Sequence, residues 1–185
     1  MARTKEKLLT ADDLLRLDSE RIRGELIQGA LCETMPTGVR HGHIVVNLTI
    51  LLGGFIKPRR FGWILASEVG FLLERDPDTV RAPDIAYVSA NRLPLDADVP
   101  GYYEGAPDLA IEIISPSDRP RELYHKARMW ISFGAPLVWV VDPENRAIEV
   151  HRPNQPVLHL AEDDTLDGSE TLPGFSCPVR DVFEL

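Results

Sequence analysis

Residues 107–142 read PDLAIEIISPSDRPRELYHKARMWISFGAPLVWVVD and predict a strand, a helix and a second strand in succession. The first run, Leu109–Ile114, is short, rich in Ile and bounded by prolines, which is typical of a strand buried on both faces. The last run, Leu137–Val141, has the same character. A connection of about 14 helical residues is long enough for a crossover, so we expect two parallel strands and a right-handed crossover.

The helix between these strands has recognisable ends. Ser117 or Asp118 can cap its N-terminus, and Gly134 followed by Pro136 ends it. Its apolar positions recur at helical spacing and are expected to face the sheet: Leu123, Ala127, Trp130 and Ile131. Lys126 lies at the edge of this apolar face and could therefore reach inward.

Composition points to a globular protein without a broadly basic surface. A chain of 185 residues is expected to form one domain, residues 1–185. The formal charge of -9 argues against general nucleic-acid binding but does not exclude a local basic site. No apolar run is expected to span a membrane and the N-terminus lacks a signal peptide, so we expect a cytoplasmic protein. Cys32 and Cys177 form no metal-binding pattern and are expected to be reduced structural thiols.

The N-terminal part predicts a helix, a hairpin and a longer helix. Residues 8–17 begin a short helix in which Thr10 and Asp13 resemble a capping box. Residues 23–27 and 30–34 flank the turn Gln28-Gly29 and predict a hairpin, with Glu25 in its first strand.

Residues 39–55 predict the longer helix, ended by Gly53-Gly54. Its apolar stripe is Ile44, Leu48, Leu51 and Phe55. His41 and His43 point in different directions on a helix and are not expected to share a metal ion. A lone His near a helix start is more often structural.

Two long strands are predicted next, residues 61–73 and 79–89, joined by a turn at 74–78. By strand alternation Asp84 shares a face with the small apolar residues Val80, Ala82, Ala86 and Val88. Pro83 removes a hydrogen-bond donor beside Asp84, which indicates an edge or a local break. Residues 90–106 are rich in Asp, Pro and Gly and predict a long loop.

Further strands are expected at residues 147–152 and 157–160, and the tail from Leu172 to Leu185 is expected to complete the sheet edge. The order of elements predicts an α/β or α+β sandwich with a mixed central sheet flanked by helices.

Asp84 and Glu112 are carboxylates in the middle of apolar runs on adjacent predicted strands. Two such groups in a cleft of low dielectric repel each other unless a cation lies between them. Mg²⁺ fits, because it binds through one or two carboxylates and keeps water for a phosphate substrate. Lys126 is the candidate for stabilising charge that develops in the transition state.

The order Asp84, Glu112 and then a Lys is similar to the PD-(D/E)XK nuclease superfamily, which has the fold of restriction endonucleases. The pattern departs at Ile114, where the superfamily has its Lys. A closer resemblance, over about residues 8–152, is to the bacterial Uma-two family of restriction endonucleases, in which that Lys lies in the following helix. The matching phrases are Glu25–Gly29, His41, Arg81–Asp84, Glu112–Ser117, Lys126 and Asp142-Pro143.

The resemblance implies a Mg²⁺- or Mn²⁺-dependent endonuclease that hydrolyses DNA. Asp84 and Glu112 would hold the metal, Lys126 would contact the scissile phosphate, Glu25 would be an auxiliary acid, and His41 a possible auxiliary residue. Nucleases of this fold often act as homodimers. The alternative is a catalytically inactive protein of the same fold that acts as a protein-interaction module, and a hydrolase of small phosphate esters is a third hypothesis.

Each of these residues also has a structural interpretation. Asp84 could cap a turn, and Glu112 could form a buried ion pair with Arg81 or Lys126. Lys126 could extend along apolar surface to reach water. Glu25 could be a surface residue of the hairpin instead of a third acidic ligand.

Overall fold

The structure is a computed structural model that describes residues 8–19, 22–66, 69–115 and 120–184. The chain divides into two compact units. The first unit comprises Met1–Pro36, Gly70–Ala82 and Val99–Ala106, and the second comprises Thr37–Val69, Pro83–Asp98 and Pro107–Leu185. The single domain expected over residues 1–185 stays a prediction.

The first unit is built on a five-stranded sheet of order β2-β1-β5-β4-β7. Its elements are α1 (Ala11–Ser19), β1 (Gly24–Ile27), β2 (Ala30–Glu33), β4 (Phe71–Glu74), β5 (Thr79–Arg81) and β7 (Tyr103–Glu104). Neighbouring strands are antiparallel except for the parallel pair β4 and β7. A small core joins the helix to the sheet and contains Ala11, Leu14, Leu26, Leu72 and Val80.

Local sequence signals in the first unit are confirmed. The Thr10 hydroxyl accepts from the Asp13 amide, and the Asp13 carboxylate accepts from the Thr10 amide, as in a capping box. The hydrogen bond from the Thr10 amide is the main reason why the pKa of Asp13 falls to about 2. Gln28 and Gly29 both have positive φ, of 49° and 78°, which is the conformation of a type I′ hairpin turn.

The second unit is built on a six-stranded mixed sheet of order β11-β10-β9-β8-β6-β3. Its strands are β3 (Gly62–Ala66), β6 (Ile85–Ser89), β8 (Leu109–Ile113), β9 (Leu137–Asp142), β10 (Ala147–His151) and β11 (Leu158–Leu160). The strands β8 and β9 are parallel, as expected, and the other pairs are antiparallel. The mixed α+β architecture with a mixed sheet is therefore confirmed.

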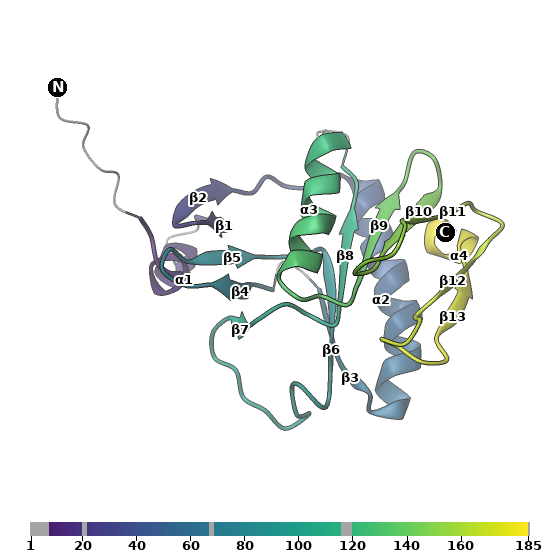
Figure 1. The fold of residues 1–185 in the computed structure, drawn as a ribbon, viewed down its shortest axis with the longest axis horizontal. Helices are drawn as coiled ribbons and strands as arrows, with labels where there is room; N and C mark the ends of the chain where they lie inside the picture. The colour runs from purple at the N-terminus through teal and green to yellow at the C-terminus, as the bar shows by residue number, and fades with distance from the viewer. Residues whose placement is uncertain (1–7, 20–21, 67–68, 116–119, 185) are drawn as a thin grey trace. The chain divides into compact units, whose positions relative to one another are not determined.

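Two helices, α2 (Val39–Arg59) and α3 (Pro120–Ser132), cover opposite faces of this sheet (Figure 1). The main core lies under α2 and includes alternate residues of β8, which are Leu109, Ile111 and Ile113. The residues between them, Ala110 and Glu112, point to the other face, because side chains alternate along a strand. The connection that contains α3 lies on that face, with Ala127 and Trp130 fully buried.

The helix α2 differs from its prediction in length and in its buried stripe. It continues through Gly53-Gly54 and Pro58 and ends at Arg59, with Arg60 in the left-handed conformation. Gly has a low helix propensity, but a helix can continue through Gly where packing against neighbouring elements outweighs that propensity. Gly53 is buried against Ile64. The fully buried apolar positions are Ile44, Leu48, Leu52 and Ile56, so the prediction that Leu51 and Phe55 belong to the buried stripe is wrong, and both lie beside it.

By length and composition alone α2 could cross a membrane, contrary to the expectation that no segment could. The same properties are typical of a core helix. Its apolar stripe packs on the six-stranded sheet, but only 28% of the candidate window is buried, and Val46 and Ile50 are exposed.

The two long predicted strands are each divided between the two sheets. The first gives β3 and β4, and the second gives β5 and β6. The second division falls at residues 82–84, where Pro83 removes a donor, so the local break is confirmed. Asp84 consequently lies in a bend directly before β6, and the prediction that it belongs to a continuous strand is wrong.

The C-terminal segment also differs from its prediction. It does not complete the edge of the six-stranded sheet, because it forms a separate two-stranded sheet of β12 (Thr165–Asp167) and β13 (Ser176–Pro178), followed by α4 (Arg180–Phe183). Its apolar side chains, including Leu166, Leu172 and Phe175, join the main core instead. The residues that were expected to cap α3, Ser117 and Asp118, lie outside the described residues, as does the side chain of Leu123.

The two thiols should differ in reactivity. Cys32 is exposed, whereas Cys177 is buried in the main core. Burial is the main cause that raises the pKa of Cys177 to about 11, and the charge of Asp181 adds to it. Since the thiolate is the reactive form, iodoacetamide at neutral pH should label Cys32 in the native protein and Cys177 only after unfolding. Mass spectrometry of the labelled peptides checks this, and equal native labelling of both thiols would contradict the burial of Cys177.

Candidate active site

Glu112 is a buried carboxylate on the face of β8 that α3 covers. Its side chain is 4% exposed. The carboxylate accepts hydrogen bonds at both oxygens, from the Trp130 indole nitrogen at 2.8 Å on Oε1 and from the Lys126 ammonium at 3.2 Å on Oε2. An ionised carboxylate without partners would cost several kcal/mol in such a place. Two donors from one helix therefore make the charge of Glu112 tolerable inside the protein.

Lys126 reaches inward from α3, as its place at the edge of the apolar face indicates. Its side chain is 33% exposed, so one end of the ion pair is near water while the carboxylate of Glu112 is not. Of the two structural partners considered for Glu112, Lys126 is present and Arg81 instead pairs with Glu25. Lys126 thus neutralises Glu112 from the side of the ion pair that is nearer to water.

Trp130 is a member of the site that the sequence interpretation treats only as core. It is fully buried, and its indole N–H needs an acceptor there. Lys126 and Trp130 are four residues apart and so lie on one helix face. That spacing, together with a buried acid in the preceding strand, is the signal that could have identified Trp130 as a partner of Glu112.

Replacement of Trp130 by Phe should lower stability. Phe keeps most of the apolar contacts but removes the indole donor to Oε1 of a buried carboxylate. The expected loss in free energy of unfolding is about 2 kcal/mol, measured by urea denaturation. The matched control is Trp63→Phe, because Trp63 donates to the Pro94 carbonyl at an exposed position and should cost much less. Equal losses in free energy of unfolding would show that the bond from Trp130 to Glu112 stabilises the fold no more than the exposed bond of Trp63 does.

Asp84 is held by two donors at the start of β6. Oδ2 accepts from the Ile113 amide at 2.7 Å, and Oδ1 lies 3.2 Å from Nε2 of His41. Its side chain is 21% exposed, so the carboxylate is more accessible than that of Glu112. The bond to Ile113 runs from the bend directly before β6 to β8, and so it ties that bend to the neighbouring strand.

The pairing of β6 with β8 brings the two predicted acids together. The antiparallel ladder pairs Ile85 with Ile111, and one further step in the same register sets Asp84 opposite Glu112. The amide that Asp84 accepts belongs to Ile113, the residue directly after Glu112. Asp84 and Lys126 therefore both contact the segment Glu112-Ile113 of β8, Asp84 through the Ile113 amide and Lys126 through the Glu112 carboxylate, and their joint role in a site stays a prediction.

His41 lies in the first turns of α2 and is 7% exposed. The sequence alone favours a structural role for a lone His near a helix start. In the structure His41 contacts the carboxylate of Asp84, so its structural role is to position a candidate metal ligand. His43 points elsewhere, toward Asn47 and the C-terminal segment, as the spacing of two on a helix predicts.

Glu25 belongs to the first unit and is not a surface residue of the hairpin. Its side chain is 13% exposed, lies 3.1 Å from Nε of Arg81 and accepts from the Ala82 amide at 2.8 Å. These contacts hold the end of β5 at Arg81, three residues before Asp84 along the chain. The role of Glu25 as an auxiliary acid stays a prediction.

The carboxylates can be tested for their fit to a divalent cation. Within the described residues no group of three or more His, Cys, Asp or Glu side chains forms a metal cluster. Mg²⁺ does not require one, since one or two carboxylates and several waters suffice. Asp84 and Glu112 offer the oxygen ligands that such a cation takes, and their joint role as its ligands stays a prediction.

Comparison with known proteins gives a family and a fold. Residues 11–180 match the model of the Uma2 family, described as "Putative restriction endonuclease". A search of curated proteins found no match. Among solved structures, a crystal structure of a "putative nuclease belonging to DUF820" from Anabaena variabilis is similar, with a TM-score of 0.80 and 23% sequence identity. The similarity covers 95% of this chain and 97% of that chain, and it shows a shared fold.

Proposed function

Because the chain belongs to the Uma2 family, we propose that it is a divalent-metal-dependent DNA endonuclease of the PD-(D/E)XK type. The observation that carries the proposal is the grouping of Asp84, Glu112 and Lys126 on one segment of β8, through the Ile113 amide and the Glu112–Lys126 contact. Two acids and a cation at one place are what metal-assisted hydrolysis of a phosphodiester requires.

The roles follow from exposure and contacts. Asp84 and Glu112 hold Mg²⁺ or Mn²⁺, and Asp84 is the more accessible ligand. His41 keeps the Asp84 carboxylate in place. Lys126 keeps its ammonium at the border between Glu112 and water, where it can donate to a phosphate oxygen as negative charge develops. A metal ion bound here would supply Lewis acidity at the phosphate and lower the pKa of an attacking water.

The decisive experiment is a cleavage assay with supercoiled plasmid. The purified protein is incubated with Mg²⁺, with Mn²⁺ and with EDTA, beside an Asp84→Asn variant purified in the same way. Nicked or linear plasmid with metal, and none with EDTA or with the variant, is the expected result. Cleavage that persists in the Asp84→Asn preparation would come from a contaminant or another site. No cleavage by the parent with either metal would overturn the proposal.

A second candidate is a protein-interaction module of the same fold without catalysis. The specific observation in its favour is that Glu112 already has a protein cation, Lys126, in place of a metal. The net charge of -9 also suits a protein partner better than DNA. Calorimetric titration with Mn²⁺ separates the two, because the module predicts no binding and the nuclease predicts binding that Asp84→Asn removes.

A further inference from the structure

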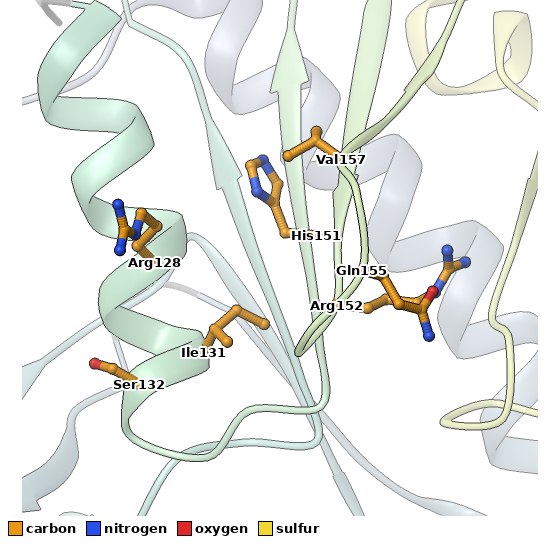
Figure 2. A pocket seen from close by; sticks show the side chains of 7 residues that line it. All are labelled: Arg128, Ile131, Ser132, His151, Arg152, Gln155 and Val157. Atoms are coloured by element: carbon orange, nitrogen blue, oxygen red, sulfur yellow. The ribbon is translucent and has the colours of Figure 1, made fainter.

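The outward side of α2 carries exposed apolar side chains. Val39, Val46 and Ile50 are 92%, 53% and 66% exposed. At about 100° per residue these positions lie within about 40° of one another, so they form one stripe, opposite the buried stripe that packs on the sheet. The cavity of the second unit, about 320 Å³, lies between α3 and β10 (Figure 2), so the outer stripe of α2 is a separate surface.

The outer stripe has no charge along most of its length. Between Arg40 and Lys57 the sequence contains no Asp, Glu, Lys or Arg. Val46, Ile50 and Gly54 follow one another at intervals of four residues, which is the ridge by which helices pack against each other. Gly54 is exposed, and a Cβ added there would meet open space. The ridge therefore has a low point at Gly54 that a side chain from outside the molecule can fill.

The C-terminal end of the outer stripe is cationic. Lys57, Arg59 and Arg60 are exposed there. The surrounding sequence does not offset them, since no acidic residue occurs between Glu33 and Glu68. Because three cations share this end, the loss of a single one changes its charge only in part.

The N-terminal half of the outer stripe lies beside acids. The short helix α4 packs there, and the Asn47 side chain of α2 donates to the Glu184 carbonyl at 2.6 Å. The Glu184 side chain is exposed, and Asp181 precedes it in α4. Arg40 is exposed at the same end and offsets one of these two acids. The outer face of α2 thus runs from a negative end to a positive end.

We propose that this face binds the same face of a second copy of the chain, with the two α2 helices antiparallel about a two-fold axis near Ile50. A two-fold contact uses one patch twice, so the patch must complement itself. An axis near Ile50 sets Val46 of each copy over Gly54 of the other. It also sets the cationic end of each α2 beside the acids of the other copy's α4, whereas parallel helices would bring like charges together.

The size and charge of the face decide what kind of contact it makes. A helix of 21 residues is about 30 Å long, and one helix pair with its flanks lies at the lower end of specific interfaces, about 1,200 Å². We therefore expect a dimer that dissociates on dilution, with a dissociation constant in the micromolar range. An anionic membrane is a poorer occupant, because the acids of α4 border the face and would be repelled by it.

Sedimentation equilibrium over about 1–200 µM protein, without metal or DNA, tests the proposal. The parent should pass from a species of 20.7 kDa to one of twice that mass. Ile50→Glu brings two carboxylates together at the axis and should weaken the dimer by about tenfold or more. The matched control is Leu158→Glu, which adds the same charge at an exposed apolar position of β11. It should dimerise like the parent, because β11 is the sheet edge opposite β3, against which α2 packs. Thermal melts establish that both variants fold.

Cysteine cross-linking tests the orientation of the two helices. A Cys32→Ser background removes the exposed native thiol. In it, Ile50→Cys should give a disulfide-linked dimer on mild oxidation, because the residue meets its own copy at the axis. Val39→Cys is the matched control. Val39 is more exposed than Ile50 but lies about 16 Å from the axis along the helix, and so about 30 Å from its own copy. A non-reducing gel reports both variants.

Each contrary result overturns a stated part of the proposal. A parent that stays monomeric over the whole range would overturn the dimer, and its co-sedimentation with phosphatidylglycerol vesicles would assign the face to a membrane instead. A dimer that Ile50→Glu leaves unchanged would place the interface on another surface. Equal cross-linking of the Val39→Cys and Ile50→Cys variants would overturn the antiparallel arrangement. None of these measurements uses DNA, so they stand whether or not plasmid is cleaved.

Discussion

Replacement of Glu112 by Gln should abolish nearly all cleavage, by about 10²–10³-fold, and should remove Mn²⁺ binding. The variant keeps the shape of the side chain but loses the charge that would hold the metal. The amide can still accept from Trp130 through its oxygen, but its NH₂ group then faces the Lys126 ammonium, which is also a donor. Plasmid cleavage and Mn²⁺ calorimetry measure both effects.

The same variant should lower the free energy of unfolding by about 1–2 kcal/mol in metal-free buffer. Repulsion between two carboxylates alone would predict the opposite, that neutralising one acid stabilises the fold. The structure reverses the expectation because Glu112 has two donors of its own. The loss stays modest because Lys126 is one-third exposed and can turn to water. Glu144→Gln, at an exposed turn, is the control and should change neither stability nor cleavage. A Glu112→Gln variant that cleaves like the parent would place the chemistry elsewhere.

The fold of the second unit was largely predictable because its strongest signals are local. The two apolar runs of residues 107–142 are continuous and flanked by prolines, and they became the parallel strands β8 and β9. Two parallel neighbouring strands need a long crossover connection, which is usually a helix. A prediction of the parallel pair therefore also predicts the helix between the strands.

The errors arose where packing between distant segments decides the outcome. Gly53-Gly54 has low helix propensity, yet α2 continues through it, because Gly53 is covered by Ile64 of β3. The long strands at residues 61–89 were divided between two sheets, and only Pro83 marked one of the divisions in the sequence. Propensity is a weak prior in such places, since tertiary contacts outweigh it.

The sequence could indicate that the two candidate acids lie near one segment of β8, but it could not predict their hydrogen bonds. A carboxylate in an apolar run is visible in the sequence. Burying an ionised group without a partner costs several kcal/mol, so such a residue indicates that a partner is present. Their partners are less visible: the Ile113 amide carries no side-chain signal at all, and Trp130 resembles any core aromatic residue. His41 is 43 residues from Asp84 in the chain, and only the fold brings them to 3.2 Å.

Replacement of Lys126 by Met should slow cleavage by about 10²-fold while strengthening the response to metal. Met keeps the aliphatic stem but removes the ammonium, and with it the donor that lies 3.2 Å from Oε2 of a carboxylate that is 4% exposed. Stability in metal-free buffer should fall by about 3 kcal/mol, as when one partner of a buried pair is removed. Mn²⁺ should then stabilise the variant more than the parent, because the metal no longer competes with Lys126 for Glu112.

A second substitution in the same variant tests whether the ammonium can act from the strand. Residues 112 and 114 point to the same face of a strand, and the Ile114 amide still bonds to Val141, so the alternation continues to that position. Lys at 114 would therefore stand beside Glu112, where the PD-(D/E)XK pattern has it. Ile114→Lys combined with Lys126→Met should recover part of the lost cleavage rate and part of the metal-free stability. Lys57→Met, at the exposed end of α2, is the charge control and should behave like the parent. If Lys126→Met cleaves as fast as the parent, the charge that stabilises the transition state comes from another residue, and the ammonium of Lys126 serves only to neutralise Glu112.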